Sequence, residues 1–261
     1  MRLEKYLLEY RQYNKETRSK DISEEEAIKI VKTKCKQAVK IYTSSNTRIY
    51  RGLYKSGLGY YRYVEPSKFK RLSANINNYY TLMIDNFKAW SKYPKRSKSI
   101  VCTTDANRAC MYSHCNYPFV VFPFDGAKIG VCPEFDIWDT YVDVDSFIPI
   151  TLDQLTNELE RQFIFSYGSH IFEWSDFKKA CKELDKDKKN IDYGGEILTE
   201  YFLDEKIKLI EWLEKLFTPK KCKFKLININ QMKDDRKEVW TDANSVLISG
   251  LLIDEFMKNF L

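Results

Sequence analysis

The sequence has little of the material from which many familiar active sites are built. Two histidines and nine glycines occur among its 261 residues. The dinucleotide pattern GxGxxG, the P-loop pattern GxxxxGK and the zinc pattern HExxH are all missing. The sequence therefore has too few histidines for a mechanism that depends on a cluster of them. A bound dinucleotide would have to be held by arginine, hydroxyl groups and backbone atoms, since no glycine-rich loop is present to hold its phosphates.

Disulfide and membrane signatures are also missing. The seven cysteines are odd in number and no two of them are spaced as CxxC, whereas a secreted disulfide framework normally has an even number in a shorter chain. No stretch of about 18 apolar residues occurs that would span a bilayer, and residues 1–16 lack the apolar run of a signal peptide. We therefore expect a cytoplasmic protein with no membrane partner. The frequent Lys, Asn, Ile and Tyr are consistent with a phage or a low-GC bacterium, which places the protein in the host cytoplasm if it is viral.

One group of conventional metal ligands lies close together in the sequence. It consists of Cys110, His114 and Cys115, but the spacing fits no common zinc pattern. Because free cysteine behaves mainly as a small buried hydrophobe, we expect buried thiols here and no metal cofactor.

What the chain does contain is typical of a folded domain. Hydrophobic residues make up 44% of the sequence and aromatic residues 15%, enough to build a substantial core. The net charge of +6 arises from 43 basic and 37 acidic residues. This mild excess is compatible with a phosphate-bearing ligand or a nucleic acid, but it lacks the concentrated basicity of a dedicated DNA-binding arm.

Helical patterns occupy two regions. The region 1–42 begins the chain, and within it Ser23 followed by Glu26 forms a capping box before apolar residues at helical spacing. The region 151–219 begins with a second capping box, Thr151 with Gln154, and ends at Pro219. We interpret the second region as a helical insertion.

Short β-like runs lie on both sides of this insertion. They are residues 48–53, 99–104, 119–122, 128–131, 222–226, 236–241 and 246–248. The Asp125-Gly126 step predicts a tight hairpin between the third and fourth runs, and we expect the last three runs to pair with one another. Few βαβ alternations occur, so the sequence predicts a single α+β domain over residues 1–261 with antiparallel or mixed sheets.

Three separated segments place reactive polar residues on expected strands. Residues 49–53 read IYRGL and contain Arg51, residues 97–104 end in Thr103 and Thr104, and residues 237–240 read KEVW and contain Glu238. Individually, these are an ordinary strand arginine, a helix cap and a solvent-facing glutamate. Their order and strand context together suggest a shared site.

The three segments resemble the active-site motifs of the ADP-ribosyltransferase family, in the branch that uses an arginine, a Ser/Thr strand and a glutamate. The aromatic-Arg-Gly strand of that family is similar to Tyr50-Arg51-Gly52. The Ser/Thr strand end, followed by a helix with a packed alanine, is similar to residues 102–104 with Ala109. The Glu-Val-hydrophobic strand is similar to residues 238–240. The resemblance extends from about residue 48 to residue 248, with 151–219 as an insertion, and implies an ADP-ribosyltransferase-like fold.

The resemblance implies that NAD is the substrate and that Glu238 is the catalytic carboxylate. Cleavage of the bond between nicotinamide and ribose develops positive charge on the sugar, which a carboxylate stabilises. Glu238 would also accept the proton of the incoming nucleophile. A hydroxyl of Thr103 or Thr104 would hydrogen-bond Glu238 and fix its rotamer.

The resemblance also implies cofactor-binding roles for other residues. The forked guanidinium of Arg51 suits the phosphates of NAD, and Gly52 lets backbone approach the nicotinamide amide closely. Tyr79 or Tyr80 is the candidate aromatic lid over the nicotinamide ring, with packing in the core as the alternative role for each.

The sequence departs from the family pattern at one position. Many members have Glu or Gln two residues before the catalytic glutamate, where it helps to choose the acceptor, and this chain has Arg236. Arg236 is therefore the acceptor-side candidate, and arginine-directed protein modification is in doubt. The acceptor is a macromolecule, either protein or nucleic acid.

Three alternatives stay open. The first alternative is an inactive ADP-ribosyltransferase-like binding protein. The second is an NAD glycohydrolase, in which water replaces the acceptor, and the third is a basic nucleic-acid-binding protein. The last is suggested by aromatic and basic residues at 59–63 and 68–71, which could stack on bases and contact phosphates. The alternative interpretation of the same residues is a pair of strands with an exposed charged face.

Overall fold

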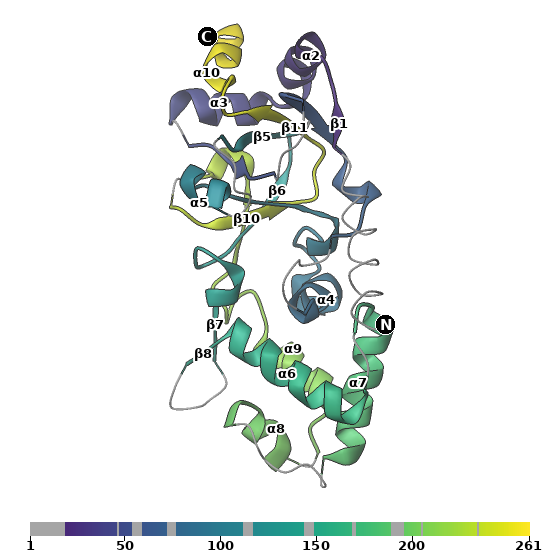
Figure 1. Ribbon diagram of the computed structural model, residues 1–261. Helices are drawn as coiled ribbons and strands as arrows, with labels where there is room; N and C mark the ends of the chain where they lie inside the picture. Colours follow the sequence, from purple (N-terminus) through teal and green to yellow (C-terminus); the bar gives the residue numbers. More distant parts are fainter. Residues whose placement is uncertain are drawn as a thin grey trace. The chain divides into compact units, whose positions relative to one another are not determined.

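The computed structural model describes residues 19–45, 47–53, 59–71, 77–111, 117–143, 149–168, 171–188, 196–204, 206–233 and 235–261 (Figure 1). The chain divides into two compact units. Unit 1 comprises Met1–Leu72, Tyr93–Phe135 and Leu226–Leu261, and unit 2 comprises Ser73–Lys92 and Asp136–Lys225. The helical region 151–219 lies within unit 2, and the three segments that resemble active-site motifs all lie in unit 1.

A large antiparallel sheet dominates the described residues, so the α+β class is confirmed. Nine strands of the described part of the chain form it in the order β1-β3-β11-β5-β2-β4-β10-β6-β9. Each neighbouring pair from β1 through to β6 is antiparallel. The strands are β1 (Lys20–Asp21), β2 (Tyr50–Arg51), β3 (Tyr61–Val64), β4 (Ile100–Thr103), β5 (Phe119–Pro123), β6 (Lys128–Val131), β9 (Lys225–Asn228), β10 (Glu238–Thr241) and β11 (Ser245–Ser249).

The pairing differs from the sequence expectation in two places. Gly126 has the positive φ of a tight turn, at 80°, but β5 pairs with β11 and β2 while β6 pairs with β10. The predicted hairpin is therefore wrong, because the turn separates two strands that each find other partners. The last three strands also do not pair with one another, since β11 lies between β3 and β5 and β10 lies between β4 and β6.

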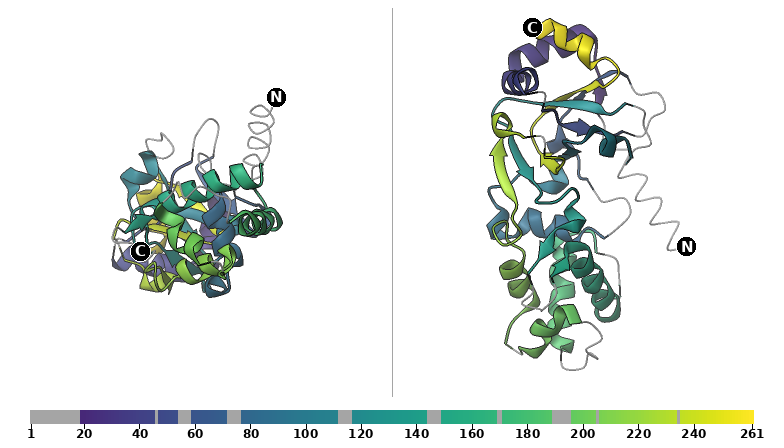
Figure 2. Two further views of the ribbon diagram at one scale, coloured as in Figure 1. Left: turned by 90° about the horizontal axis from the view of Figure 1, so that it is seen from below. Right: turned by 90° about the vertical axis from the view of Figure 1, so that its left-hand side faces the viewer.

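Three helices pack on one end of unit 1 (Figures 1 and 2). They are α2 (Glu24–Lys34), α3 (Lys36–Ser44) and α10 (Ile253–Met257). Ser23 caps α2 by accepting a hydrogen bond from the backbone N–H of Glu26, at 3.2 Å. Residues 1–18 of the predicted N-terminal helical region lie outside the described residues, and the remainder is interrupted at Cys35, which has non-helical φ and ends α2.

The core of unit 1 is aromatic at its centre. The ring of Phe122 on β5 makes an edge contact with Tyr42 of α3, at 5.0 Å between centroids, and another with Phe256 of α10, at 5.9 Å. The Tyr42 hydroxyl donates to the backbone carbonyl of Val121. Since all five residues of β5 are buried, this strand supplies the apolar surface on which the helices pack.

Gly130 on β6 has a specific packing role. It is the register partner of Trp240 on β10, and a Cβ built on Gly130 would lie 2.3 Å from the Trp240 ring. The absence of a side chain at position 130 therefore allows the indole to lie flat against β6. Trp240 is fully buried there.

A Gly130→Ala substitution is expected to lower the free energy of unfolding by about 1–3 kcal/mol, since the added methyl must displace the buried indole. Guanidinium chloride denaturation followed by tryptophan fluorescence measures the change. Gly126→Ala is a useful comparison, because nothing lies within 4 Å of the added Cβ and only the positive φ opposes it. Equal stability of Gly130→Ala and the wild type would contradict this packing.

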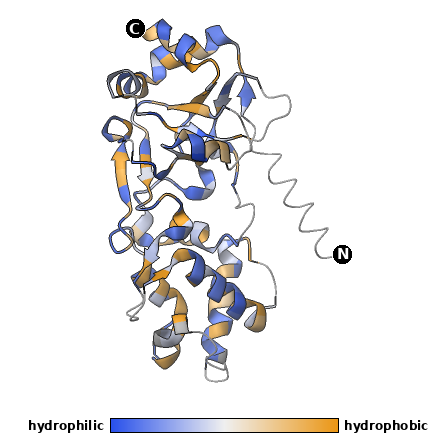
Figure 3. Cartoon of the chain, turned by 60° about the vertical axis from the view of Figure 1, so that its left-hand side comes forward, coloured by the Kyte–Doolittle hydropathy of each residue, from blue (hydrophilic) through white to orange (hydrophobic). Residues whose placement is uncertain are grey.

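Unit 2 is mainly helical. Its helices are α4 (Tyr79–Asn86), α6 (Leu152–Ser166), α7 (Trp174–Asp187), α8 (Thr199–Leu203) and α9 (Leu209–Leu216), with a small sheet of β7 (Tyr141–Val142) and β8 (Ile150–Thr151). Both hydrogen bonds of the predicted Thr151/Gln154 capping box are present. The helices are amphipathic, with hydrophobic and hydrophilic residues on different faces (Figure 3). Among the helices of the described residues, none combines the length and the apolar character needed to cross a membrane.

Short 3-10 segments connect these elements. Those that bear on the site are η1 (Pro66–Lys68) and η3 (Arg96–Lys98), together with the short helix α5 (Ala106–Met111), all in unit 1. The others are η2 (Lys88–Trp90), η4 (Ile137–Asp139), η5 (Glu196–Leu198), η6 (Ile229–Gln231) and η7 (Lys258–Phe260).

Candidate functional site

The three motif strands lie next to one another in the sheet. Strand β4 has β2 on one side and β10 on the other. Thr103 on β4 is the register partner of both Tyr50 on β2 and Glu238 on β10. Three segments separated by roughly 50 and 135 residues along the chain are thereby placed on adjacent strands, as the sequence analysis required.

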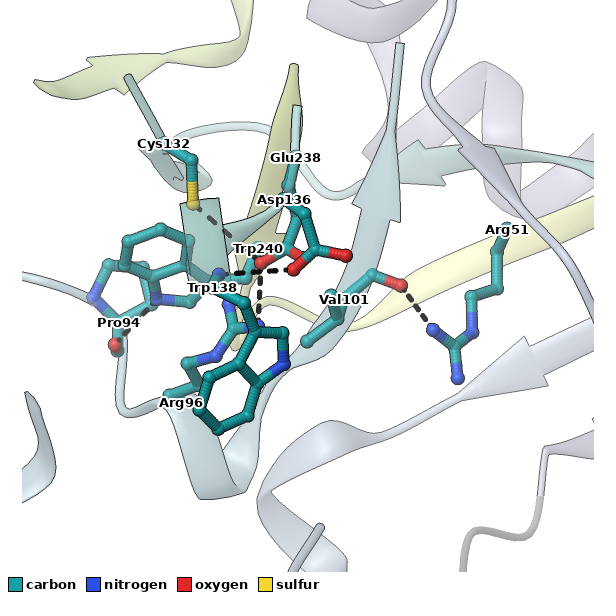
Figure 4. A network of polar contacts seen from close by, with 9 residues as sticks. All are labelled: Arg51, Pro94, Arg96, Val101, Cys132, Asp136, Trp138, Glu238 and Trp240. Atoms are coloured by element: carbon teal, nitrogen blue, oxygen red, sulfur yellow. Dashed lines mark hydrogen bonds and ion pairs between the residues drawn. The ribbon is translucent and has the colours of Figure 1, made fainter. Parts of the chain in front are cut away.

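The carboxylate of Glu238 is held by two side chains (Figure 4). Nη2 of Arg96 donates to Oε1 of Glu238 at 2.6 Å, and the thiol of Cys132 donates to the same oxygen at 3.7 Å. The Arg96 side chain is 1% exposed and the Glu238 side chain is 12% exposed. The carboxylate is therefore fixed from the protein side, with part of its surface accessible.

Arg96 is itself held by aromatic packing. Its guanidinium carbon lies 5.2 Å from the ring centroid of Trp240, at the distance of a cation–π contact. The Trp240 indole N–H donates to the carbonyl of Pro94 at 3.0 Å, and Tyr93 stacks on the same indole at 6.2 Å. A chain of contacts from Pro94 through Trp240 to Arg96 thus determines where Glu238 points.

Arg96 is the functional residue that sequence reasoning missed. It lies in the segment 92–98, KYPKRSK, in which four of seven residues are basic. The sequence offers no pattern by which Arg96 differs from Lys95 or Lys98. Only the fold distinguishes it, because Arg96 forms an ion pair with Glu238.

The hydroxyls of the threonine pair have backbone partners. Oγ1 of Thr103 accepts from the N–H of Asp105 at 3.1 Å, and Oγ1 of Thr104 accepts from the N–H of Lys237 at 3.1 Å. The backbone N–H of Thr104 also donates to the carbonyl of Lys237, at 3.1 Å. Thr104 therefore joins the end of β4 to the residue before Glu238 and fixes the position of β10 beside β4. The side-chain contact with Glu238 that was expected from a threonine is made by Arg96. The helix-capping role falls to Asp105, whose carboxylate accepts from two backbone N–H groups of α5.

Arg51 lies at the end of β2, directly before Gly52. Its Nη1 donates to the backbone carbonyl of Val101 on β4 at 2.6 Å, which anchors the guanidinium against the neighbouring strand. Burial lowers the pKa of Arg51, the adjacent charge of Arg71 lowers it further, and Glu238 acts in the opposite direction. Arg51, Arg71 and Glu238 are therefore close enough to interact electrostatically.

Cys102 lies between these charges on β4. Burial raises the pKa of its thiol to about 12, with Arg51 lowering it and Glu238 raising it. The thiol therefore stays protonated near neutral pH and is not an activated nucleophile.

Tyr79 and Tyr80 are placed in the core of unit 2. They are 3% and 1% exposed. The Tyr79 ring contacts Phe163 at 5.5 Å, and the Tyr80 ring contacts Trp138 at 4.5 Å. These contacts show both rings in the packing role that was the alternative to an aromatic lid.

Arg236 lies just before β10 and is exposed. It has φ of 55°, a left-handed conformation that is uncommon for a residue other than glycine. Such positions often accompany functional sites, where surrounding structure holds the backbone in place. The Lys237 side chain donates to the carbonyl of Pro133, while the Arg236 side chain is exposed.

The basic segment 59–63 and the possible metal ligands have the following surroundings. Within the basic segment 59–63, Arg62 is paired with Asp21 at 2.7 Å, and Tyr61 and Tyr63 pack on Phe256 and Phe124. Of the possible metal ligands, His114 and Cys115 lie outside the described residues. Within the described ranges, no group of three or more His, Cys, Asp or Glu side chains is placed to hold a metal ion.

No family model, curated protein sequence or solved structure matches the chain.

Proposed function

We propose that the protein is an NAD-dependent mono-ADP-ribosyltransferase that moves ADP-ribose from NAD to a macromolecular acceptor. The observation that carries the proposal is the position of Thr103 as register partner of both Tyr50 and Glu238. It places the arginine strand, the threonine strand and the glutamate strand side by side, in the arrangement that the motif resemblance requires. A carboxylate and guanidinium groups then occupy one region of unit 1.

The residues present fit the two charged parts of NAD. Glu238 is held by Arg96 and Cys132 yet remains 12% exposed, so one face of the carboxylate is accessible to a ribose that develops positive charge. Arg51 supplies a half-buried, anchored guanidinium for phosphate oxygens. NAD would supply the activated glycosidic bond, with nicotinamide as the leaving group.

The chain's own residues then divide the work of the reaction. Glu238 stabilises the developing oxocarbenium charge and accepts the proton released by the acceptor nucleophile. Arg96 holds the Glu238 carboxylate in position. Thr103 and Thr104 act through the backbone by locking β4 to β10, and Arg51 with Gly52 binds the cofactor. Arg236, exposed at the start of β10, faces the acceptor and favours one that carries negative charge.

Two labelled forms of NAD test this proposal when they are offered with a crude bacterial lysate. With label on the adenine ring, a transferase puts label on a polymer, which protease or nuclease digestion identifies as protein or nucleic acid. With label on nicotinamide, the same reaction releases free nicotinamide in equal amount.

The alternatives give different results in the same experiment. An NAD glycohydrolase releases nicotinamide without labelling any polymer. An inactive binding protein releases none. If lysates from several bacteria show no release of nicotinamide and no labelled polymer, the proposed transferase is contradicted.

A further inference from the structure

The charge of a second arginine, Arg71, acts on Arg51, and the resemblance accounts for Arg51 only. Arg71 follows η1, and its backbone N–H donates to the carbonyl of Ser97 in η3 at 2.6 Å. This hydrogen bond places Arg71 next to the segment that carries Arg96. Arg71 and Glu238 both influence the buried Cys102 thiol on β4, which puts them on the same part of the sheet as Arg51.

The guanidinium of Arg71 has unused hydrogen-bonding capacity. Its Nη1 is buried and has no hydrogen-bond partner among the residues that the structure describes. The Nη1 of Arg51, in comparison, is occupied by the carbonyl of Val101. A buried donor without a partner costs free energy, and such a donor in a native structure requires an explanation.

The arginines near Cys102 also carry positive charge that favours a bound anion. The charges of Arg71, Arg96 and Glu238 all act on Arg51. An arginine keeps its charge inside proteins, and the Glu238 carboxylate is already paired with Arg96. Two positive charges, on Arg51 and Arg71, remain for an anion that carries two negative charges.

We infer that Arg71 is a second binding residue for the diphosphate of the substrate, and that Arg51 and Arg71 each take one phosphate group. The inference rests on the proposed function and deepens it, because it assigns the ligand class of this region as a diphosphate ester such as a dinucleotide. Arg71 contributes to substrate affinity, and the chemical step depends on Glu238.

The test compares Arg71→Gln with the wild type by calorimetric titration of ADP, adenosine and NAD. Removing a charged hydrogen-bond donor is expected to weaken ADP and NAD binding by about 10- to 100-fold. Adenosine has no phosphate, so its binding should not change. Arg48→Gln is the matched control, because Arg48 is a half-buried arginine of unit 1 that pairs with the exposed Asp254, and it should bind all three ligands like the wild type.

A second variant keeps the test interpretable if Arg71→Gln does not fold. Arg71→Lys keeps the charge and the aliphatic stem but removes the forked geometry, so it should weaken ADP binding less than Arg71→Gln does. Thermal unfolding of each variant shows which of the two can be interpreted. If Arg71→Gln does not fold, a loss of ADP affinity in Arg71→Lys supports the inference and unchanged affinity overturns it.

The outcomes separate this inference from the proposed function. Equal binding of ADP and NAD by Arg71→Gln and the wild type overturns the inference alone. If binding of ADP and NAD depends on Arg71 but no nicotinamide is released, the proposed transferase activity is wrong and the diphosphate-binding site is supported. A wild type that binds neither ligand overturns both. If only binding of a single-stranded oligonucleotide depends on Arg71, the site serves polymer phosphate and the inference is wrong.

Discussion

Glu238→Gln is expected to release nicotinamide from NAD at least about 100-fold more slowly than the wild type, the scale typical of losing one preorganised electrostatic contact in a transition state. Glutamine has the same shape as glutamate but no negative charge to place beside the ribose, and it cannot take the acceptor's proton. NAD binding should persist, because the proposed phosphate contacts come from arginines. Initial rates at saturating NAD, measured with the acceptor identified from labelled lysate, give the comparison.

Folding should survive this substitution. The glutamine carbonyl oxygen can still accept the hydrogen bond that Arg96 donates to Glu238, although the ion pair is lost. Glu158→Gln provides the matched control, because Glu158 is 9% exposed and pairs with Arg161 at 2.8 Å within unit 2. The control should keep full turnover. If Glu238→Gln consumes NAD as fast as the wild type, the assignment of Glu238 as the catalytic carboxylate is wrong.

Arg96→Gln is expected to give the largest loss of stability, about 3–5 kcal/mol in the free energy of unfolding. The substitution leaves the Glu238 carboxylate without its ion-pair partner and removes the cation–π contact with Trp240. Guanidinium chloride denaturation measures the loss. Turnover should fall as well, since Arg96 fixes the direction of the carboxylate.

A double-mutant cycle with Glu238→Gln tests whether the loss arises from this pair. In the Glu238→Gln background, Arg96→Gln should cost less than it does in the wild type, because no carboxylate remains at position 238 to be left unpaired. Additive costs in the two backgrounds would show that Arg96 stabilises the fold through contacts other than Glu238. The proposed positioning of Glu238 by Arg96 would then fail.

Local features of this chain were predictable because neighbouring residues determine them. The caps at Ser23 and Thr151 are present as expected. The runs that contain Arg51, Thr103 and Glu238 are strands close to the expected positions, since alternating or β-branched apolar residues indicate a strand wherever its partner lies. The three motif strands could be proposed as neighbours only through the family resemblance.

Features set by distant contacts were not predictable. Asp125-Gly126 forms a turn, yet β5 and β6 separate because β11, β2 and β10 offer them other partners. Arg96 has no sequence signal, since its role depends on Trp240 and Glu238, which lie more than 140 residues away along the chain. Burial of Tyr79 depends likewise on rings of α6 and α7.

The strand order also affects how the molecule is made. Strands β10 and β11 follow every other strand of the sheet along the described chain, yet both occupy interior positions, between β4 and β6 and between β3 and β5. Until they emerge from the ribosome, the earlier strands have no way to join into one sheet, and Glu238 is not yet present. Such long-range pairing slows folding. The site that the proposed function uses is therefore expected to form only after β10 and β11 have been synthesised.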